Sequence, residues 1–160
     1  MTTKAEVIEA IHSVDARLAA LRNEIIAKGE QPLLEGTWRV RDALSHLAAR
    51  ANGVARVMAR VEAAANPGAA PVTPPRNVDE INAGQVEERA GRTVEQLLDE
   101  IRDGHAAAIA AIQKIEDEVL TRMLPFGFRP GEAAVAEMMA MGGPRHDHNH
   151  LDQIEAAVKA

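Results

Sequence analysis

The chain has 160 residues, a length typical of one domain spanning residues 1–160, and it carries a net charge of −6, which gives no electrostatic basis for binding nucleic acid or an anionic membrane. It contains 31 alanines but only one Trp, two Phe and no Tyr, which favours close-packed helices over a sheet. The absence of Cys excludes disulfides and cysteine-ligated zinc.

The first predicted helix follows Thr3, which is spaced to form a capping box with Glu6. Gly29 is a natural stop for this helix. Its apolar residues recur at alternating steps of four and three, on one face: Val7, Ile11, Val14, Leu18, Leu21 and Ile25. The segment MTTKAEVIEA lacks the apolar run of a signal peptide, and no stretch is long and apolar enough to span a membrane, so we expect a cytoplasmic protein.

The second predicted helix runs from about residue 38 to 65, with Thr37 as its N-cap. The segment after it, residues 66–92, opens with NPGAAPVTPPRN, whose prolines prevent continued helix. We expect residues 66–75 to be a solvated linker and VDEINAGQVEER to be a short helix lying across the other helices.

The third predicted helix opens at Thr93, with Gln96 completing a second capping box, and its apolar stripe extends to Val119. The fourth starts near Gly131 and runs almost to the C-terminus. Pro144, within MGGPR, predicts a kink or a short break in it. We expect no strand.

Four amphipathic helices predict an all-α four-helix bundle. Short links make the first and second helices antiparallel, and likewise the third and fourth. The long crossover between the second and third helices can run the length of the bundle, which predicts up-down-down-up topology.

Three of the six histidines favour a metal site. His146 and His150 are four residues apart on the inward stripe of the fourth helix, so their imidazoles can converge on one ion. In the predicted topology His46, about 12 Å into the second helix, lies level with His150, about 14 Å from the end of the fourth. We therefore expect His46, His146 and His150 to be the ligands.

The remaining histidines have different expected environments. His105 lies on an inward stripe, which is compatible with four roles. These are a fourth metal ligand, a hydrogen-bond donor to a ligand, a substrate contact, and a core histidine bonded to a carbonyl or to water. His148 points about 200° from His146 on a helical wheel and is expected to be exposed, and His12 is expected to be solvated.

Other polar residues near the predicted site have two interpretations each. The carboxylates of Asp147 and Asp152 can each hold an imidazole in one tautomer, or they are solvated charges on the helix. For Asp147 we expect the solvated charge. Three residues are candidates for contacting a substrate or cosubstrate: Asn82, Arg50 and His105. For Asn82 and Arg50 the alternative is a structural or surface role.

The chain offers no obvious nucleophile of its own. The stretch RHDHNH is not HExxH, which argues against a metalloprotease, and Ser45 beside His46 is expected to be a surface hydroxyl. No catalytic residue is therefore assigned, and the nucleophile should be a thiol or water brought in from outside.

The motifs together resemble the DinB-like (YfiT-like) superfamily of four-helix bundles. GTWRVRDALSHLAARANG is similar to its second helix, RHDHNHLDQI to its fourth, and VDEINAGQVEER to its crossover. Leu151 and Asp152 stand where Arg-Gly often follows the last histidine. The resemblance implies a three-histidine metal site at His46, His146 and His150, homodimers, and activities that include transferases and isomerases using bacillithiol, mycothiol or glutathione.

These observations support three hypotheses for function. The first is a metal-dependent transferase or isomerase that uses a low-molecular-weight thiol on a small electrophile. The second is a metal-dependent hydrolase, and the third a non-catalytic stress-related or small-molecule-binding protein. Three imidazoles with an open position suit a catalytic divalent ion, with Zn²⁺ as the default and Ni²⁺, Fe²⁺ or Mn²⁺ compatible with the ligands.

Overall fold

The computed structural model describes residues 1–66, 68, 77–127 and 129–160. The elements, in chain order, are α1 (Lys4–Ala27), α2 (Val40–Arg50), α3 (Gly53–Ala65), α4 (Val78–Glu88), α5 (Val94–Lys114), α6 (Asp117–Leu120), β1 (Met123–Pro125), β2 (Glu132–Ala134), α7 (Val135–Ala140), a π-helical turn (Met141–Arg145) and α8 (His146–Val158).

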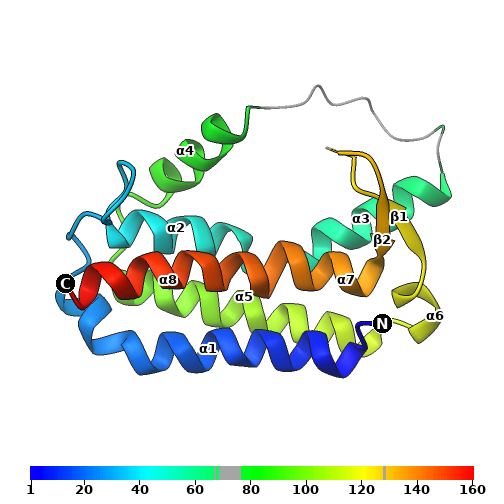
Figure 1. The fold of residues 1–160 in the computed structure, drawn as a ribbon, viewed down its shortest axis with the longest axis horizontal. Helices are drawn as coiled ribbons and strands as arrows, with labels where there is room; N and C mark the ends of the chain where they lie inside the picture. Colours follow the sequence, from blue (N-terminus) through cyan, green and yellow to red (C-terminus); the bar gives the residue numbers. More distant parts are fainter. Residues whose placement is uncertain (67, 69–76, 128) are drawn as a thin grey trace.

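Four helical rods form the bundle, as Figure 1 shows: α1, α2 with α3, α5, and α7 with α8. The α1 rod is antiparallel to α2, α5 runs in the same direction as α2, and α8 returns antiparallel to both (Figure 1). The predicted up-down-down-up bundle is confirmed. The predicted crossover helix is present as α4, which contacts α2, and the predicted linker at 66–75 falls largely outside the described residues.

Two predicted helix starts are confirmed by their caps. The backbone N–H of Glu6 donates to the Thr3 hydroxyl at 3.2 Å, and that of Gln96 to the Thr93 hydroxyl at 3.1 Å. In each box the longer side chain also accepts the N–H of the cap residue. These bonds satisfy donors that a helix start leaves open.

The start of α2 differs from the prediction. Thr37 is not its cap: Arg39 is the N-cap residue, and its backbone N–H donates to the Asp42 carboxylate at 2.9 Å. The Arg39 guanidinium also pairs with Asp42 at 3.0 Å. Asp42 therefore serves the cap through its carboxylate, a role that the hydroxyl of Thr37 was expected to fill.

The single helix predicted over 38–65 is interrupted at Asn52, whose backbone (φ −96°, ψ 65°) is not helical. Just before the break, Ala51 approaches α5 so closely that a Cβ added at Gly104 would lie 2.5 Å from the Ala51 Cβ. The apolar stripe did not reveal the break because buried Val54 continues it on the other side.

The link between the third and fourth rods contains a β-hairpin that the sequence analysis did not expect. Strands β1 and β2 pair antiparallel, with Leu124 opposite Ala133. Gly127 and Gly131 within the turn have φ of 82° and 103°, which favours glycine. The third helix accordingly ends at Lys114 and not near Val119.

A π-helical turn at Met141–Arg145 replaces the predicted kink or break, so the rod continues through Pro144. A turn of this kind inserts extra backbone into an α-helix and rotates the residues after it. Beyond it the buried stripe falls on Asp147, Leu151 and Ile154. His146 and His150, which were predicted to point straight inward, lie half-buried at the edge of this stripe.

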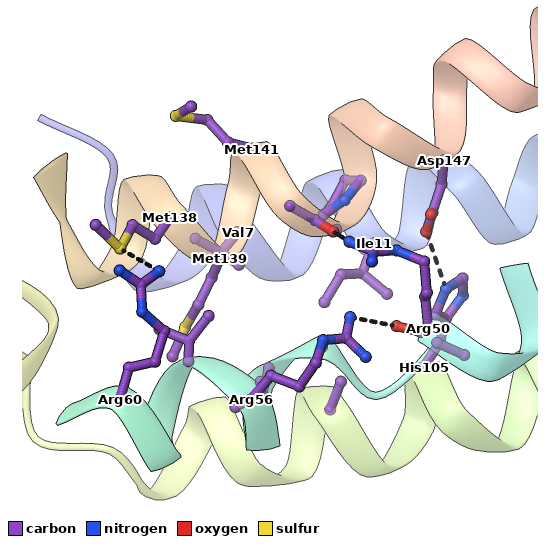
Figure 2. A pocket seen from close by; sticks show the side chains of 18 of the residues that line it. Val7, Ile11, Arg50, Arg56, Arg60, His105, Met138, Met139, Met141 and Asp147 are labelled. Atoms are coloured by element: carbon purple, nitrogen blue, oxygen red, sulfur yellow. Dashed lines mark hydrogen bonds and ion pairs between the residues drawn. The ribbon is translucent and has the colours of Figure 1, made fainter. Parts of the chain in front are cut away.

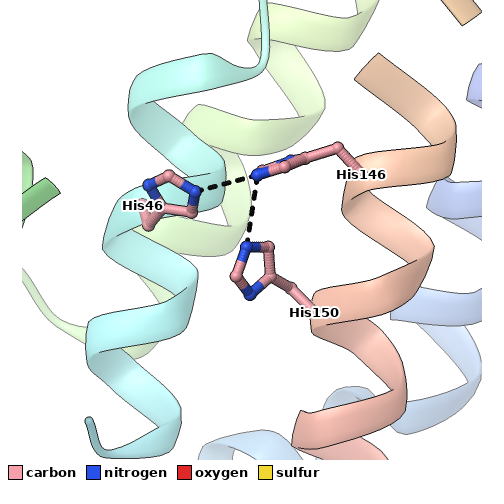
Figure 3. A group of neighbouring side chains, drawn as sticks. All are labelled: His46, His146 and His150. Carbon is pink, nitrogen blue, oxygen red and sulfur yellow. Dashed lines mark hydrogen bonds between the residues drawn. The ribbon is translucent and has the colours of Figure 1, made fainter. Parts of the chain in front are cut away.

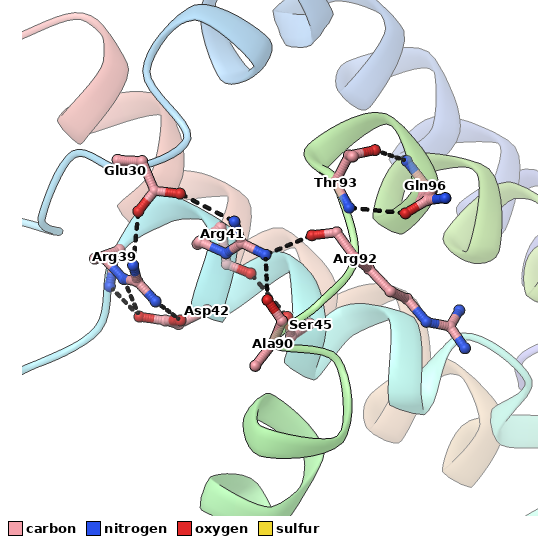
Figure 4. A network of polar contacts seen from close by, with 9 residues as sticks. All are labelled: Glu30, Arg39, Arg41, Asp42, Ser45, Ala90, Arg92, Thr93 and Gln96. Carbon is pink, nitrogen blue, oxygen red and sulfur yellow. Dashed lines mark hydrogen bonds and ion pairs between the residues drawn. The ribbon is translucent and has the colours of Figure 1, made fainter.

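Arg41 ties α2 to the start of α5 (Figure 4). Its guanidinium donates to the carbonyls of Ala90, at 3.2 Å, and Arg92, both in the link between α4 and α5, and pairs with Glu30 at 3.0 Å. This network fixes the end of the crossover against α2. It thereby holds α4 beside the helix that carries His46.

None of the helices in the described part of the chain is both long and apolar enough to cross a membrane.

The tight contact at Gly104 yields a stability prediction. We expect Gly104→Ala to lower the free energy of unfolding by up to about 2 kcal/mol, because an overpacking cost of about 1–3 kcal/mol is offset by a helix-propensity gain of only about 1 kcal/mol. Gly84→Ala in α4 is the matched control: nothing lies within 4 Å of its added Cβ, so it should stabilise by about 0.5–1 kcal/mol. Denaturant unfolding measures both, and equal effects of the two variants would contradict the predicted clash.

Candidate metal centre

Three imidazoles meet between α2 and α8 (Figure 3). The Nε2 atom of His146 lies 3.0 Å from Nε2 of His46 and 3.2 Å from Nε2 of His150. One nitrogen from each ring lies within 4.8 Å of the other two, so the group can hold a metal ion. The structure thus brings together the three residues that the sequence analysis selected.

The second nitrogen of every ring faces a side-chain oxygen. The pairs are His46 Nδ1 with Gln85 Oε1 at 2.7 Å, His146 Nδ1 with Asp147 Oδ1 at 3.1 Å, and His150 Nδ1 with Gln153 Oε1 at 3.1 Å. These oxygens are acceptors, so each Nδ1 carries the proton as donor. Each neutral ring therefore presents an unprotonated Nε2 to the centre of the cluster.

The donor set fits a divalent cation. The Nε2 lone pair of His146 faces those of His46 and His150 at 3.0 and 3.2 Å, and these lone pairs repel unless a cation or a proton lies between them. Zinc–nitrogen distances of about 2.0–2.1 Å separate neighbouring nitrogens by about 2.9–3.4 Å, depending on coordination geometry. The observed separations fall in this range, and an oxygen on the opposite ring nitrogen is the usual support of a metal-binding histidine.

Burial keeps two of the three rings neutral. Burial is the largest cause that lowers the pKa of His46 to about 4; the bond to Gln85 opposes the shift, and the neighbouring rings and Arg50 add to it. Burial, and then the charge of His146, lower the pKa of His150. Neutral imidazole is the form that binds a metal, so these rings are available as ligands at neutral pH.

Trp38 covers one side of the cluster. Its ring centroid lies 5.3 Å from that of His46 and 6.0 Å from that of His150. His46 itself is buried, whereas His146 and His150 are half-buried, so the cluster is reached from the α8 side. Trp38 belongs to the segment GTWRVRDALSHLAARANG, which resembles the second helix of the DinB-like superfamily.

A charged chain of contacts supports His146 from the core. Asp147 accepts from His146 at 3.1 Å and lies 3.5 Å from Nε2 of His105, whose Nδ1 bonds Asp15 at 2.5 Å. Burial opposes a charge on His105, but the bonds to Asp147 and Asp15 outweigh it and raise the pKa to about 9. Burial would raise the pKa of Asp147, but the same two histidines hold it below its usual range.

This chain of contacts corrects two expectations. Asp147 is buried, not a solvated helix charge, because the π-helical turn rotates it into the core stripe. His105 bonds two carboxylates, not a carbonyl or water, and it acts on the cluster through Asp147. Its role as a cofactor or substrate contact stays a prediction.

Three other expectations differ from the structure in whole or in part. Asp152 pairs with Arg17 of α1 at 2.6 Å and does not orient an imidazole; of its two interpretations, the exposed helix charge agrees with the structure. Ser45 is buried and donates to the Arg41 carbonyl at 3.0 Å, so it is not a surface hydroxyl. His148 is half-buried against α1, whereas His12 is exposed as expected.

Asn82 and Arg50 lie at different places around the cluster. Asn82 is half-buried on α4, one turn before Gln85, and Arg50 lies one turn after His46 on α2. Sequence reasoning missed Gln85, although its spacing of three from Asn82 on a predicted helix was an available signal. It also missed Gln153, which follows His150 by three on the same helix.

The sequence matches the family Mycothiol maleylpyruvate isomerase N-terminal domain over residues 9–142. The chain belongs to this family. The match includes His46 and most of the bundle, and it ends within the π-helical turn, just before His146. The resemblance to the DinB- and YfiT-like superfamily is thereby confirmed. A comparison with curated proteins finds no match.

Solved structures share the fold at low sequence identity. YfiT from Bacillus subtilis, described as a probable metal-dependent hydrolase with an unusual four-helix bundle topology, is 16% identical, with a TM-score of 0.71 over 98% of this chain and 86% of its own. An uncharacterised protein from Escherichia coli UTI89 is 20% identical, with a TM-score of 0.68 over 99% and 94%.

A third similar structure is that of the colibactin self-resistance protein ClbS in complex with a dsDNA. It is 17% identical, with a TM-score of 0.76 over 100% of this chain and 98% of its own. The expectation that the present chain does not bind nucleic acid rests on its charge and stays a prediction.

The buried His105 predicts a pH-dependent stability. Its pKa rises from 6.5 to about 9 on folding, so its charge stabilises the fold fully below pH 6.5 and this contribution is lost as the pH rises through 9. We expect the free energy of unfolding of the chelator-treated protein to fall by up to about 3 kcal/mol between pH 6.5 and 9.5. His105→Gln should remove this slope, and a slope that persists in that variant would contradict the assignment.

Proposed function

We propose that the protein is a metal-dependent enzyme whose three-histidine site activates a low-molecular-weight thiol for transfer to a small electrophile, or for isomerisation of a thiol adduct. The metal is a divalent ion, with zinc as the first candidate. A homodimer in the cytoplasm is part of this proposal.

One observation carries the proposal: Nε2 of His146 lies 3.0 and 3.2 Å from those of His46 and His150, one nitrogen of each ring lies within 4.8 Å of the others, and the Nδ1 of each ring is held by a side-chain oxygen. A structural zinc site is normally closed by four protein ligands, whereas a catalytic site has three and an open position. Within the described residues, the group that can hold a metal consists of these three histidines alone. Membership of a family named for a mycothiol-dependent isomerase supports a thiol as the exogenous partner.

The chain's own residues have separate tasks in this proposal. His46, His146 and His150 bind the ion, and Gln85 and Asp147 hold the tautomers of two of them. A bound divalent ion lowers the pKa of a thiol or water that enters its open position.

The nucleophile comes from outside the chain. The sequence has no Cys, and the hydroxyl of Ser45 already donates to the Arg41 carbonyl. When the thiol adds to an activated double bond, its sulfur forms a bond to one carbon. The electron pair of the double bond then binds the thiol proton at the other carbon. In this step every atom of the thiol and of the acceptor is retained in the product.

A metal-dependent hydrolase is the second candidate. The same open position accepts water, whose pKa a bound zinc lowers to about 7. The likeness to YfiT, described as a probable metal-dependent hydrolase, favours this alternative. A small-molecule-binding protein without catalysis is the third.

The ligand assignment predicts a pattern of metal loss. We expect about one divalent ion per chain, and we expect His46→Ala, His146→Ala and His150→Ala each to lose it, because two imidazoles hold an ion far more weakly than three. Elemental analysis of untagged protein measures this.

The matched controls are His12→Ala and His148→Ala, since neither ring points into the cluster. Both should retain the ion. Loss of metal from His148→Ala with retention in His146→Ala would show that the assigned helical face is wrong.

The thiol hypothesis predicts a spectroscopic change. We expect mycothiol, bacillithiol or glutathione to give the Co²⁺-substituted protein the charge-transfer absorption of sulfur coordination, and His150→Ala to abolish both this change and conjugation to a model electrophile. An unchanged spectrum, with hydrolysis of activated esters or amides, would replace the transferase with the hydrolase. No spectral change with thiols and no hydrolysis would favour the third candidate, a small-molecule-binding protein without catalysis.

A further inference from the structure

A cavity shown in Figure 2 adjoins the histidine cluster through Asp147, which lines the cavity and contacts His146. Its volume is about 410 Å³, within the range of small-molecule sites. It is lined from α2, α3, α5, α7 and the π-helical turn, and none of the three clustered histidines lines it. Asp147, which supports His146, forms part of the wall between the cavity and the cluster.

Three arginines line this cavity: Arg50, Arg56 and Arg60. Their hydrogen bonds go to neutral groups. Arg50 donates to the Gly142 carbonyl at 3.0 Å, Arg56 to the Arg50 carbonyl at 3.3 Å, and Arg60 to the Pro125 carbonyl and to the Met138 sulfur.

In the described part of the chain these guanidinium groups lack a direct carboxylate partner, although the charge of the neighbouring Asp147 opposes the lowering of the pKa of Arg50 and Arg56 by burial. Among the described residues, no Asp or Glu oxygen forms an ion pair with them within 4.0 Å. Residues 67, 69–76 and 128 contain neither Asp nor Glu. Asp147 shares the cavity, but its two oxygens face His146 and His105. The cavity therefore has an excess of positive charge.

One donor in the cavity lacks a partner. The Nε atom of Arg50 is buried and has no hydrogen bond. Burial lowers the pKa of Arg50, and burial together with the charge of Arg50 lowers that of Arg56. Both shifts mark charge that solvent does not fully screen. An unpaired buried donor costs about 1–3 kcal/mol, so the protein partners of Arg50 do not fully satisfy its guanidinium.

The rest of the lining is apolar and adaptable. Three methionines from one rod, Met138, Met139 and Met141, line the cavity together with Val54 of α3. Methionine side chains fit ligands of irregular shape because they are unbranched and polarisable. The cavity wall thus combines a mainly apolar surface with guanidinium groups.

We propose that this cavity binds a small organic anion, a carboxylate on an apolar or aromatic body, with Arg50 and Arg56 holding the carboxylate and the methionines holding the body. The planar guanidinium fork matches a carboxylate in two parallel hydrogen bonds. The apolar wall favours an organic acid over a bare inorganic anion, which would have nothing to place against the methionines. This site is separate from the proposed metal centre, and its existence does not depend on catalysis there.

The direct test compares two isosteric probes, 2-naphthoate and its neutral amide, 2-naphthamide, by calorimetry on the protein as purified. The naphthoate should bind at least about tenfold more tightly, because a hydrogen bond between charged groups exceeds a neutral one by this order. Equal affinity for the two probes, or no binding of either, would overturn the proposal.

Variants locate the anion. Arg50→Gln and Arg56→Gln should each weaken naphthoate binding about tenfold or more and change naphthamide binding less than about twofold. Arg102→Gln is the control, since Arg102 is exposed and pairs with Asp99 and Asp103 on the surface. Arg56→Gln keeps the test valid if the buried Arg50 proves necessary for folding. Equal loss of both probes in the two cavity variants would overturn the assignment of the carboxylate to these arginines.

The metal centre must be excluded as the anion's binding site, because a carboxylate can also bind a metal. Naphthoate binding should persist after chelator treatment and in His150→Ala. Its loss in both would place the anion on the metal and overturn the cavity proposal. Loss of metal without loss of naphthoate binding would support it, whatever the outcome for thiol transfer.

Discussion

The candidate site depends on one constraint: each of its three imidazoles has its Nδ1 proton held by a side-chain oxygen, so all three Nε2 lone pairs are free to face one another. Without that constraint the rings could exchange tautomers and donate to one another, and the close approach would need no cation. The oxygen on His46 comes from Gln85 of the crossover helix, and Arg41 fixes the end of that crossover against α2. The long connection of the bundle is therefore part of the site.

The π-helical turn sets which residues face the core and which face the histidine cluster. An uninterrupted α-helix would direct His146 and His150 straight into the bundle and would leave Asp147 to solvent. The inserted turn rotates the rod, so that Asp147 enters the core and the two histidines lie at its edge, where α2 brings His46. Pro144 is tolerated in the middle of the rod because the wider turn has a different hydrogen-bond pattern from the α-helix that proline would break.

The sequence predicts the bundle, its topology and the three clustered histidines, because apolar spacing and helix rise are properties of the chain itself. It does not predict the rotation at Met141–Arg145, since a π turn has no apolar period of its own, and Asp147 was misplaced for that reason. The break at Asn52 escaped detection because Val54 keeps the stripe in phase. The partners of His105 and His46 depend on which helices meet, which spacing within one helix cannot reveal.

The same residue type takes opposite charge states at the two ends of one chain of contacts, from His46 through His146 and Asp147 to His105, and the partners of each ring decide which. His46 has a neutral amide oxygen on one nitrogen and other imidazoles on the other, so burial dominates and its pKa falls to about 4. His105 has a carboxylate at each nitrogen, so the ion pairs outweigh burial and its pKa rises to about 9. Asp147 belongs to both environments: its negative charge faces a fixed cation on one side and a candidate metal ligand on the other. It therefore couples the charge of the core to the electron density on His146, and the arginine-lined cavity beyond it lies next to the candidate metal centre without sharing its ligands.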